Sequence, residues 1–266
     1  MSDDIYQHYR PEEQPFIDKV FGWIDQVDLT FAPYTTVFLT PREKMIVEQL
    51  VASRDEISVI FRGGYEGAER KQACIYPQYY EPNDEDFTIV LFNIKYPEKF
   101  GHLTHGRILG TFISTGIERE RIGDIITDGT NWHAIVDASI SDYLKTQVTK
   151  IANVGVQLEE ISFDDILNSE EQWEVKHVIS SSLRLDTLLS KVYNFSRQRA
   201  KNSVSQGDVK VNFVPMERPD VEIGINDIIS LRKFGRFWIN DIEGMTKKDN
   251  YRLNVNVLLK LSLIHI

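Results

Sequence analysis

The chain has 266 residues, a formal net charge of −10 and 42% hydrophobic residues, a composition that is ordinary for a globular protein with buried cores and does not favour a disordered chain. It contains no run of about 18 apolar residues and begins with the polar stretch MSDDIYQHYR, so we expect no membrane insertion and no secretion, and a cytoplasmic location. The single cysteine, Cys74, excludes an internal disulfide and a multi-thiolate metal site, and its apolar strand pattern predicts a buried side chain.

Two helices are predicted near the N-terminus. Apolar residues at helical spacing predict the first over 11–28. The second is expected over 39–53, because Thr40 can cap it, Pro41 suits the first helical position and Glu43 completes a Thr-x-x-Glu capping box.

Two strands, 57–61 and 71–76, are predicted around a glycine-rich turn after these helices. Together with the helices they form a small α+β domain, 1–80. The proline-containing acidic stretch that follows, EPNDEDF, has the composition of a segment that joins domains.

The next segment, 81–175, shows a recognisable order of elements. The expected elements are strand 87–96, helix 103–115, strands 122–127 and 132–137, helix 139–150 and strand 155–161. This β-α-β-β-α-β order predicts a ferredoxin-like plait, the architecture of the RRM-type single-strand RNA-binding module. The plait hosts many unrelated functions, and neither candidate central strand carries the aromatic RNA-reading motif, so the role of this domain stays open.

Residues 181–260 are predicted to form two short helices followed by a small β unit. Four apolar residues at helical spacing predict the buried face of the first helix: Leu185, Leu188, Leu189 and Val192. Ser196 can cap the second helix, in which Ala200 and Val204 face inward, and Gly207 can end it in the left-handed conformation. The fold class of the whole chain is therefore α+β. We expect the last residues, 261–266 (LSLIHI), to be a non-native tail.

The charge of the chain is segregated. Residues 181–260 hold 14 Lys and Arg against 9 Asp and Glu, whereas the remainder holds 16 against 31. Such asymmetry is typical of a nucleic-acid-binding module attached to an acidic body. Chance clustering on a solvated surface is the equally weighted alternative.

The basic residues of this segment gather around the second helix. The amide groups at its N-terminus can attract a phosphate, and Arg197 beside them can grip the phosphate oxygens. Lys201 falls on the same flank as Arg197, whereas Arg199 falls well away. Arg184 and Lys210 extend the positive track, with Lys210 and Asn212 on one face of the strand after the helix.

The stretch LRLDTLLSKVYNFSRQRAKNSVSQGDVKVN resembles the RNA-binding domain named after small-subunit ribosomal protein S-four, with its Arg-Leu-Asp opening, Ser-Arg-x-x-Ala helix and Gly-x-Val-x-Val-Asn strand. Such domains often read Gly-Asp and Arg-Gly in two later turns, where this chain has Asn226-Asp227 and Arg232-Lys233. The geometry of those turns is therefore an open point.

Over nearly its whole length the chain resembles the bacterial YlmH family, through FLTPRE, GGYEGAERKQA, LTHGRILGTFISTGIERERIGDI and the last domain. The resemblance implies a non-catalytic, monomeric cytoplasmic protein that contacts ribosomal RNA and tRNA on a stalled large ribosomal subunit during rescue. The family's helix arginines match Arg184 and Arg197. The full set of candidate RNA-binding residues is Arg184, Ser196, Arg197, Lys201, Lys210, Asn212, Arg232, Lys233, Arg236, Lys247 and Lys248.

Two other functions compete with this interpretation. The S-four-type module also occurs in pseudouridine synthases and rRNA methyltransferases, but the sequence offers no glycine-rich cofactor turn followed by a helix, and Asp186 lies in the opening of the module itself. Family members are often encoded near cell-division genes, which leaves a division-linked interaction protein as the other alternative. We predict no cofactor, no metal and no catalytic residue.

Three further groups have a chemical and a structural interpretation, of which the structural one is favoured. His102 and His105, with His133 later, have a spacing that could hold a metal. Asp124 and Asp128 could form an acid–base pair, but turn or capping roles suit them better. The third group is the glycine-rich turn, where Gly63, Gly64, Tyr65, Arg70 and Lys71 could present an aromatic ring and two cations to RNA, or simply form a turn.

Overall fold

The computed structural model describes residues 9–97, 102–167 and 173–259. It is a mixed α+β protein with several antiparallel sheets, and it divides into two compact units, Met1–Glu170 and Glu171–Ile266, which are described separately below. The tail expected at 261–266 lies outside the described residues.

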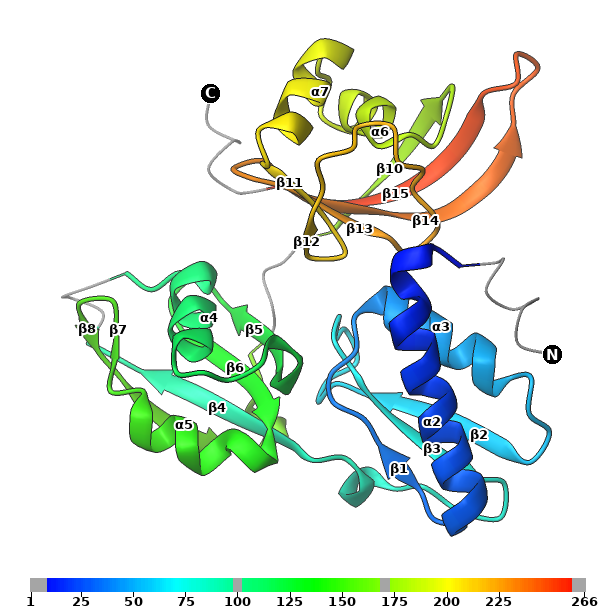
Figure 1. The fold of residues 1–266 in the computed structure, drawn as a ribbon. Helices are drawn as coiled ribbons and strands as arrows, with labels where there is room; N and C mark the ends of the chain where they lie inside the picture. Colours follow the sequence, from blue (N-terminus) through cyan, green and yellow to red (C-terminus); the bar gives the residue numbers. More distant parts are fainter. Residues whose placement is uncertain (1–8, 98–101, 168–172, 260–266) are drawn as a thin grey trace. The chain divides into compact units, whose positions relative to one another are not determined.

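The first part of the N-terminal unit packs two helices on one face of a three-stranded sheet (Figure 1). The sheet order is β1-β3-β2, and both pairings are antiparallel. The elements are η1 (Pro11–Glu13), α2 (Gln14–Thr30), β1 (Tyr34–Thr35), α3 (Pro41–Val51), β2 (Ile57–Arg62), β3 (Gln72–Pro77) and η2 (Asp84–Asp86).

The capping box predicted for the second helix is confirmed. The amide N–H of Glu43 donates to the Thr40 hydroxyl at 3.3 Å, and the Glu43 carboxylate accepts from the amide of Thr40 at 2.7 Å. Both contacts satisfy amide groups that the first helical turn leaves without partners, so α3 begins at Pro41.

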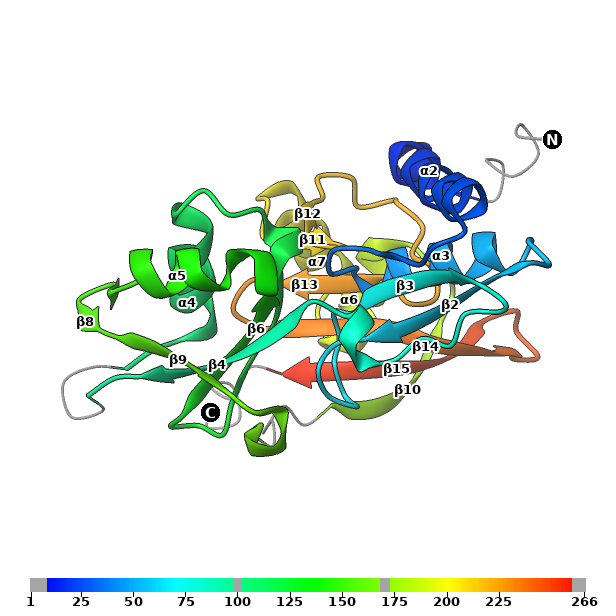
Figure 2. The ribbon, with the colours of Figure 1, turned by 90° about the horizontal axis from the view of Figure 1, so that it is seen from below.

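The second part of this unit contains a four-stranded antiparallel sheet of order β5-β6-β4-β9. Its helices α4 and α5 pack on one face of the sheet, where both contribute to a single apolar cluster (Figure 2). The elements are β4 (Ile89–Lys95), α4 (His105–Ser114), η4 (Arg119–Arg121), β5 (Ile122–Thr127), β6 (Trp132–Asp137), η5 (Ala138–Ile140), α5 (Ser141–Gln147), β7 (Lys150–Ile151), β8 (Val154–Gly155), β9 (Gln157–Ile161) and η6 (Phe163–Asp165).

This part also contains a separate two-stranded sheet that was not predicted from the sequence. A two-stranded hairpin, β7–β8, lies between α5 and β9, where the sequence predicted the end of a helix and then a single strand. The helix is also shorter than expected, because a 3-10 turn takes its first residues. Strands of two residues are too short to leave a period-2 pattern in the sequence.

The opposite face of this sheet is not open. Leu91 of β4 and Ile135 of β6 are 1% and 0% exposed, and they form a cluster with Phe38, which precedes α3. Tyr65 and Phe163 pack against the same cluster. The N-terminal sheet-and-helix part and the four-stranded sheet are thus joined by a shared apolar core.

Hydrogen bonds to one carboxylate reinforce this junction. The carboxylate of Asp124, on β5, accepts hydrogen bonds from the Tyr65 hydroxyl at 2.9 Å and from the amides of Glu69 and Arg70 at 2.7 and 3.2 Å. The Arg70 side chain is 4% exposed and donates to the Phe38 carbonyl at 3.0 Å. Asp124 therefore holds the glycine-rich loop against the second sheet.

The C-terminal unit is built on a six-stranded sheet of order β10-β15-β14-β13-β11-β12, in which every pairing is antiparallel. Both α6 and α7 lie on one face of it (Figure 1). The elements are β10 (Glu174–Ser180), α6 (Leu185–Val192), α7 (Arg197–Ser205), β11 (Val209–Val211), β12 (Val214–Pro215), β13 (Ile228–Leu231), β14 (Gly235–Met245) and β15 (Tyr251–Leu259). The edge strand β10 was not predicted from the sequence.

The helix pair was predicted correctly. The four apolar positions of α6 are at most 4% exposed, and Ala200 and Val204 of α7 are 0% exposed. The Ser196 hydroxyl accepts from the amide of Arg199 at 3.2 Å, which is the predicted cap. Gly207 follows the helix with φ of 73°, in the left-handed region that the sequence predicted for it.

The two turns without the expected glycines keep a glycine-like backbone. Asn226 has φ of 64° and Lys233 has φ of 72°. Asparagine tolerates this conformation, whereas a lysine adopts it at a cost of about 1 kcal/mol. The β13–β14 turn is therefore strained at Lys233.

We expect Lys233→Gly to raise the free energy of unfolding by about 0.5 kcal/mol, because relief of the left-handed strain exceeds the extra chain entropy of glycine. Chemical denaturation of the full chain measures this change. Arg232→Gly is the control: Arg232 lacks a positive φ, so the same change one residue earlier should lower stability. Equal effects of both substitutions would contradict the strain.

Candidate nucleic-acid interface

The centre of the candidate interface is Asp186, which lies in the first turn of α6 and is 0% exposed. Its carboxylate accepts from Nε and Nη2 of Arg184 at 3.2 and 3.3 Å, from Nε of Arg197 at 3.3 Å and from the Thr187 hydroxyl at 3.2 Å. The two arginines that the sequence singled out therefore converge on one buried acid, eleven residues away from Arg197.

The two guanidinium groups remain accessible despite this shared partner. The side chain of Arg197 is 56% exposed and that of Arg184 is 35% exposed. Arg197 contacts Asp186 through Nε, and the carboxylate does not engage its terminal nitrogens. A second carboxylate, Asp220, also acts on Arg184, so the two arginines are not balanced by Asp186 alone.

The protonation of Asp186 is set by two opposing effects. Burial raises the pKa of its carboxyl, and the hydrogen bonds from Arg184 and Arg197 outweigh burial, so the pKa lies below its usual 3.8. The same bond raises the pKa of Arg184. Asp186 is thus a fixed anion near neutral pH that orients both arginines.

Arg199, which the sequence placed away from the site, joins another group of cations. Its guanidinium carbon lies 3.8 Å from the ring centroid of Phe195 and 5.3 Å from that of Phe234. Phe234 directly follows Arg232 and Lys233, both exposed, so Arg199 contacts the turn that carries these two cations. The arginine–aromatic contact depends on the fold and has no signature in sequence spacing.

Two more candidates, Lys210 and Arg236, lie on the other face of the sheet. Lys210 pairs with Ser230 across β11–β13, and Ser230 pairs with Arg236 across β13–β14. Lys210 is exposed between the buried Val209 and Val211, as its alternation predicted. These side chains therefore face away from α6 and α7 and do not join Arg197.

Asn212 has a structural role in place of the expected exposed position beside Lys210. Strand β11 ends at Val211, and Asn212 turns into the left-handed region with φ of 49°. Its Nδ2 donates to Asp227 at 2.9 Å and its Oδ1 accepts from the amide of Ile228 at 3.0 Å. Both polar ends of the side chain are thus used to hold a turn.

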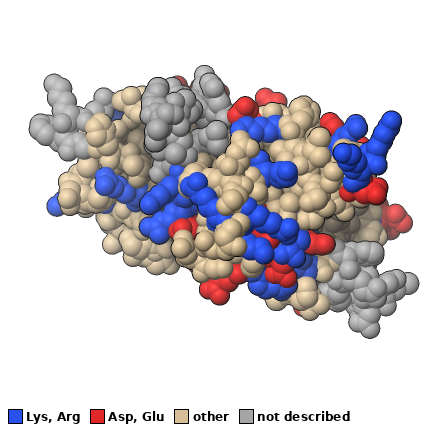
Figure 3. All heavy atoms as spheres, turned by 90° about the horizontal axis from the view of Figure 1, so that it is seen from above, with Lys and Arg blue, Asp and Glu red and all other residues tan. Residues whose placement is uncertain are grey.

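The remaining candidates are scattered. Ser196 is occupied as a helix cap, Lys201 is half-buried, and the exposed Arg232 lies 3.7 Å from the half-buried Asp208. Lys247 and Lys248 are exposed in the β14–β15 turn, about 30 Å of strand from Arg236. Figure 3, the face carrying α6 and α7, shows Lys and Arg side chains in a band interrupted by a few acids.

The structural interpretations of the aspartates and the glycine-rich turn are confirmed. Asp128 accepts from the amides of Thr130 and Asn131 and from the Asn131 side chain, and these bonds lower its pKa to about 2. Asp124 anchors the turn, so Tyr65 and Arg70 are engaged inside the unit. Cys74 is buried, as predicted, and burial raises the pKa of its thiol.

The histidines do not form the helical pair that their spacing suggested. Helix α4 begins only at His105, after the Thr104 cap, so His102 precedes the helix. His133 is 4% exposed, burial lowers its pKa, and its Nδ1 accepts from the amide of Leu167. Within the described part of the chain, no three His, Cys, Asp or Glu side chains are grouped to hold a metal ion.

The sheet face that RRM-type modules use to stack bases is occupied in this chain. On the central strands β4 and β6, this face is buried against Phe38, Tyr65 and Phe163. Base stacking on the four-stranded sheet is therefore blocked.

Among the described residues, no helix has the length and apolarity needed to span a membrane.

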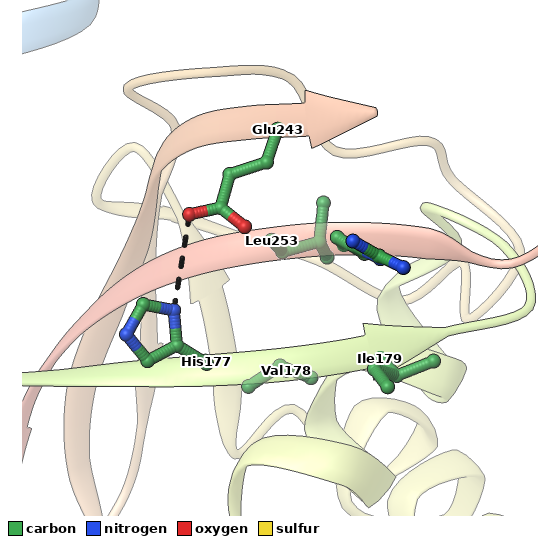
Figure 4. Close-up of a pocket in the computed structure, with 6 residues that line it drawn as sticks. His177, Val178, Ile179, Glu243 and Leu253 are labelled. Carbon is green, nitrogen blue, oxygen red and sulfur yellow. Dashed lines mark ion pairs between the residues drawn. The ribbon is translucent and has the colours of Figure 1, made fainter. Parts of the chain in front are cut away.

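A small pocket of about 220 Å³ lies on the C-terminal unit and is lined by His177, Val178, Ile179, Glu243, Arg252 and Leu253. Figure 4 shows His177 of β10 facing Glu243 of β14 across β15, and the His177 Nδ1 is 3.9 Å from the carboxylate. Both side chains are well exposed, and the lining lacks a nucleophile with a neighbouring base. The pocket offers no catalytic arrangement.

Comparison with known proteins identifies the family. Residues 12–80 match a family model described as "YlmH, N-terminal", and residues 82–165 match one described as "Putative RNA-binding domain in YlmH". The chain is 36% identical over 250 residues to the "Ribosome-associated protein quality control protein P2" of Bacillus subtilis (strain 168), covering 94% of this chain and 97% of that protein. It also matches the solved structure of "Cell division protein ylmH from Streptococcus pneumoniae" at 33% identity and a TM-score of 0.54, over 61% of this chain and 99% of the other. The chain therefore belongs to the YlmH family, as its motifs predicted.

Proposed function

We propose that this protein is a non-catalytic RNA-binding factor that associates with the large ribosomal subunit in the cytoplasm and contacts ribosomal RNA and tRNA during quality control of stalled translation. The name of the Bacillus subtilis relative supports the process, because the two proteins align along almost their full lengths. The observation that carries the proposal is the pair of partly exposed arginines held by the buried Asp186.

The proposal includes three domains. Residues 1–80 and 81–175 are proposed as an α+β domain and a ferredoxin-like plait, which the strand order β5-β6-β4-β9 supports. Residues 181–260 are proposed as the S-four-type domain, which the α6–α7 pair packed on strands supports. Strand β10 extends this last domain toward its N-terminal side.

The proposed mechanism is phosphate binding by preorganised groups. The first amides of α7 have no partner in the helix, and Ser196 satisfies only that of Arg199. A phosphate placed there meets the positive end of the helix and the terminal nitrogens of Arg197. Because Asp186 already fixes the Arg184 and Arg197 side chains, little rotamer entropy is lost on binding.

The other cations are proposed to extend this contact. Arg199, Arg232 and Lys233 form the second cationic group, and stacking on Phe195 keeps Arg199 in place. Lys201 lies on the Arg197 flank of α7. Contacts of this kind position a protein on folded RNA without reading its sequence.

We expect Arg197→Ala to weaken binding to purified large ribosomal subunits about tenfold and to lessen the slope of log affinity against log salt by about 0.7 to 0.9. Arg197→Lys keeps the charge, but a lysine cannot contact Asp186 and a phosphate at the same time. This variant should therefore have nearly the wild-type salt slope but a lower affinity than the wild type. A binding titration across a salt series measures both. Arg54→Ala, which removes an exposed cation from the other unit, is the matched control.

The competing functions predict different results. If Arg197→Ala and Arg184→Ala both bind large subunits like the wild type, the proposal is wrong and an interaction protein that does not use the arginines is favoured. Loss of one modification from the ribosomal RNA of a deletion strain, seen by mass analysis, would instead establish an RNA-modifying enzyme.

A further inference from the structure

The sheet of the C-terminal unit has a second face that the proposed phosphate site does not use. Alternation along the strands separates the two faces: Phe237 and Ile239 of β14 belong to the core under the helices, whereas Arg236 and Trp238 alternate with them. Along β15, Val255 and Val257 face the helices and Asn256 faces the other side. We call this second face the open face: Lys210, Ser230, Arg236, Trp238 and Asn256, together with Trp173. Lys210 is exposed and the other five are partly exposed, whereas Ile228, which pairs with Trp238 on the same face, is buried.

An aromatic pair lies on the open face. The rings of Trp173, which precedes β10, and Trp238 of β14 have centroids 4.2 Å apart with an interplanar angle of 53°. Strand β15 lies between β10 and β14, so the two rings meet over β15. Both side chains are only partly buried, whereas Trp23 and Trp132 are 6% and 9% exposed in cores.

Cations lie beside this pair. The guanidinium carbon of Arg236 is 5.2 Å from the Trp173 ring centroid. Arg236 is in register with Ser230 and then Lys210 across two neighbouring strands, so Lys210 and Arg236 lie about 10 Å apart on one row. Lys210 is exposed.

We propose that the open face binds a single-stranded segment of RNA, with one base stacked on the Trp173–Trp238 pair and the adjoining phosphates held by Arg236 and Lys210. An aromatic platform next to a row of cations is the general arrangement by which proteins bind single strands, because every base has a π-face and every linkage a negative charge. Partly exposed tryptophans also suit an apolar protein partner, but such a partner gives no role to the aligned cations. The inference rests on the proposed RNA-binding function and gives it a second contact of a different kind.

The test uses the full-length protein and a single-stranded uridine decamer, with tryptophan emission as the signal. The decamer should quench the emission, because the two partly exposed tryptophans are the stacking residues and the other two are buried. Trp238→Ala should weaken the affinity tenfold or more, and Trp238→Phe should keep most of it. Arg236→Gln should lessen the salt slope by about 0.7.

Tyr79→Ala, which removes an aromatic side chain that is 68% exposed in the N-terminal unit, is the control and should bind like the wild type. Thermal unfolding of each variant shows whether a loss of binding reflects a loss of fold. If Trp238→Phe keeps binding and Trp238→Ala loses it, the aromatic ring is responsible for the effect. Decamer affinity unchanged in both Trp238→Ala and Arg236→Gln would overturn the inference. A wild type that binds large subunits but not the decamer would overturn it too, and would leave the proposed function standing; failure to bind either RNA would remove both.

Discussion

Replacing Asp186 by asparagine will lower the free energy of unfolding of the C-terminal unit by about 2 kcal/mol. The substitution keeps the size of the side chain but replaces a buried carboxylate, which accepts from Arg184, Arg197 and Thr187, by an amide with one acceptor oxygen. Because both arginines are partly exposed, water can solvate the charges that lose their partner, which keeps the cost below that of a fully buried pair. Urea unfolding at pH 7 measures the change.

The matched control is Asp208→Asn, which removes a half-buried acid from the 3.7 Å pair with exposed Arg232 and should cost less than about 0.5 kcal/mol. Acid provides a second check. Since the pKa of Asp186 is lowered in the folded state, its stabilisation is present above the unfolded value of 3.8 and is lost as pH falls through the lower folded pKa. Asp186→Asn should lack that part of the acid dependence. Equal costs for the two asparagine variants would mean that Asp186 does not organise the arginines.

Gly64→Ala is expected to destabilise the N-terminal unit by about 3 kcal/mol. Gly64 has φ of 90°, and a Cβ atom added to it would lie 2.4 Å from a carbon of the Phe163 ring. Either the backbone or that ring must move, and Phe163 packs against the cluster that joins the two parts of this unit. Thermal unfolding monitored by circular dichroism gives the size of the effect.

Gly67→Ala, in the same loop, is the internal comparison. A Cβ at Gly67 meets only the Tyr65 ring at 3.4 Å, and no positive φ is required there. We expect stability within about 0.5 kcal/mol of the wild type. Comparable losses at both glycines would show that the loop is sensitive to any substitution and that the Phe163 contact is not the cause.

The elements that could be predicted from the sequence are those that local chemistry determines. The capping box at Thr40, the apolar stripe of α6 and the Ser196 cap each depend on residues within one or two helical turns of one another. Strand β10 escaped prediction because both of its faces mix apolar and polar residues, and its partner β15 follows about 75 residues later. Its pairing depends on tertiary contacts that spacing does not encode.

The same distinction applies to the candidate site. Helical periodicity put Arg197 and Lys201 on one flank of α7, but the Asp186 partner comes from another helix, and the Arg199 contact needs Phe234 from a turn 35 residues away. Asn212 was placed on the Lys210 face of the strand because the alternation was continued one residue past Val211, where β11 ends. The pair Trp173–Trp238 gave no signal, because its members are separated by 65 residues and meet only through strand order.

The shared cluster of Phe38, Leu91 and Ile135 has a consequence for how this architecture can be inherited or dissected. The two family models meet near residue 81, yet the fold buries side chains from both of them in common. Cutting the chain at that point would expose apolar surface on both fragments. Replacing one fragment alone by that of a relative would therefore disturb the packing of the shared cluster. Residues 9–167 should accordingly unfold in a single thermal transition and be inherited as one unit.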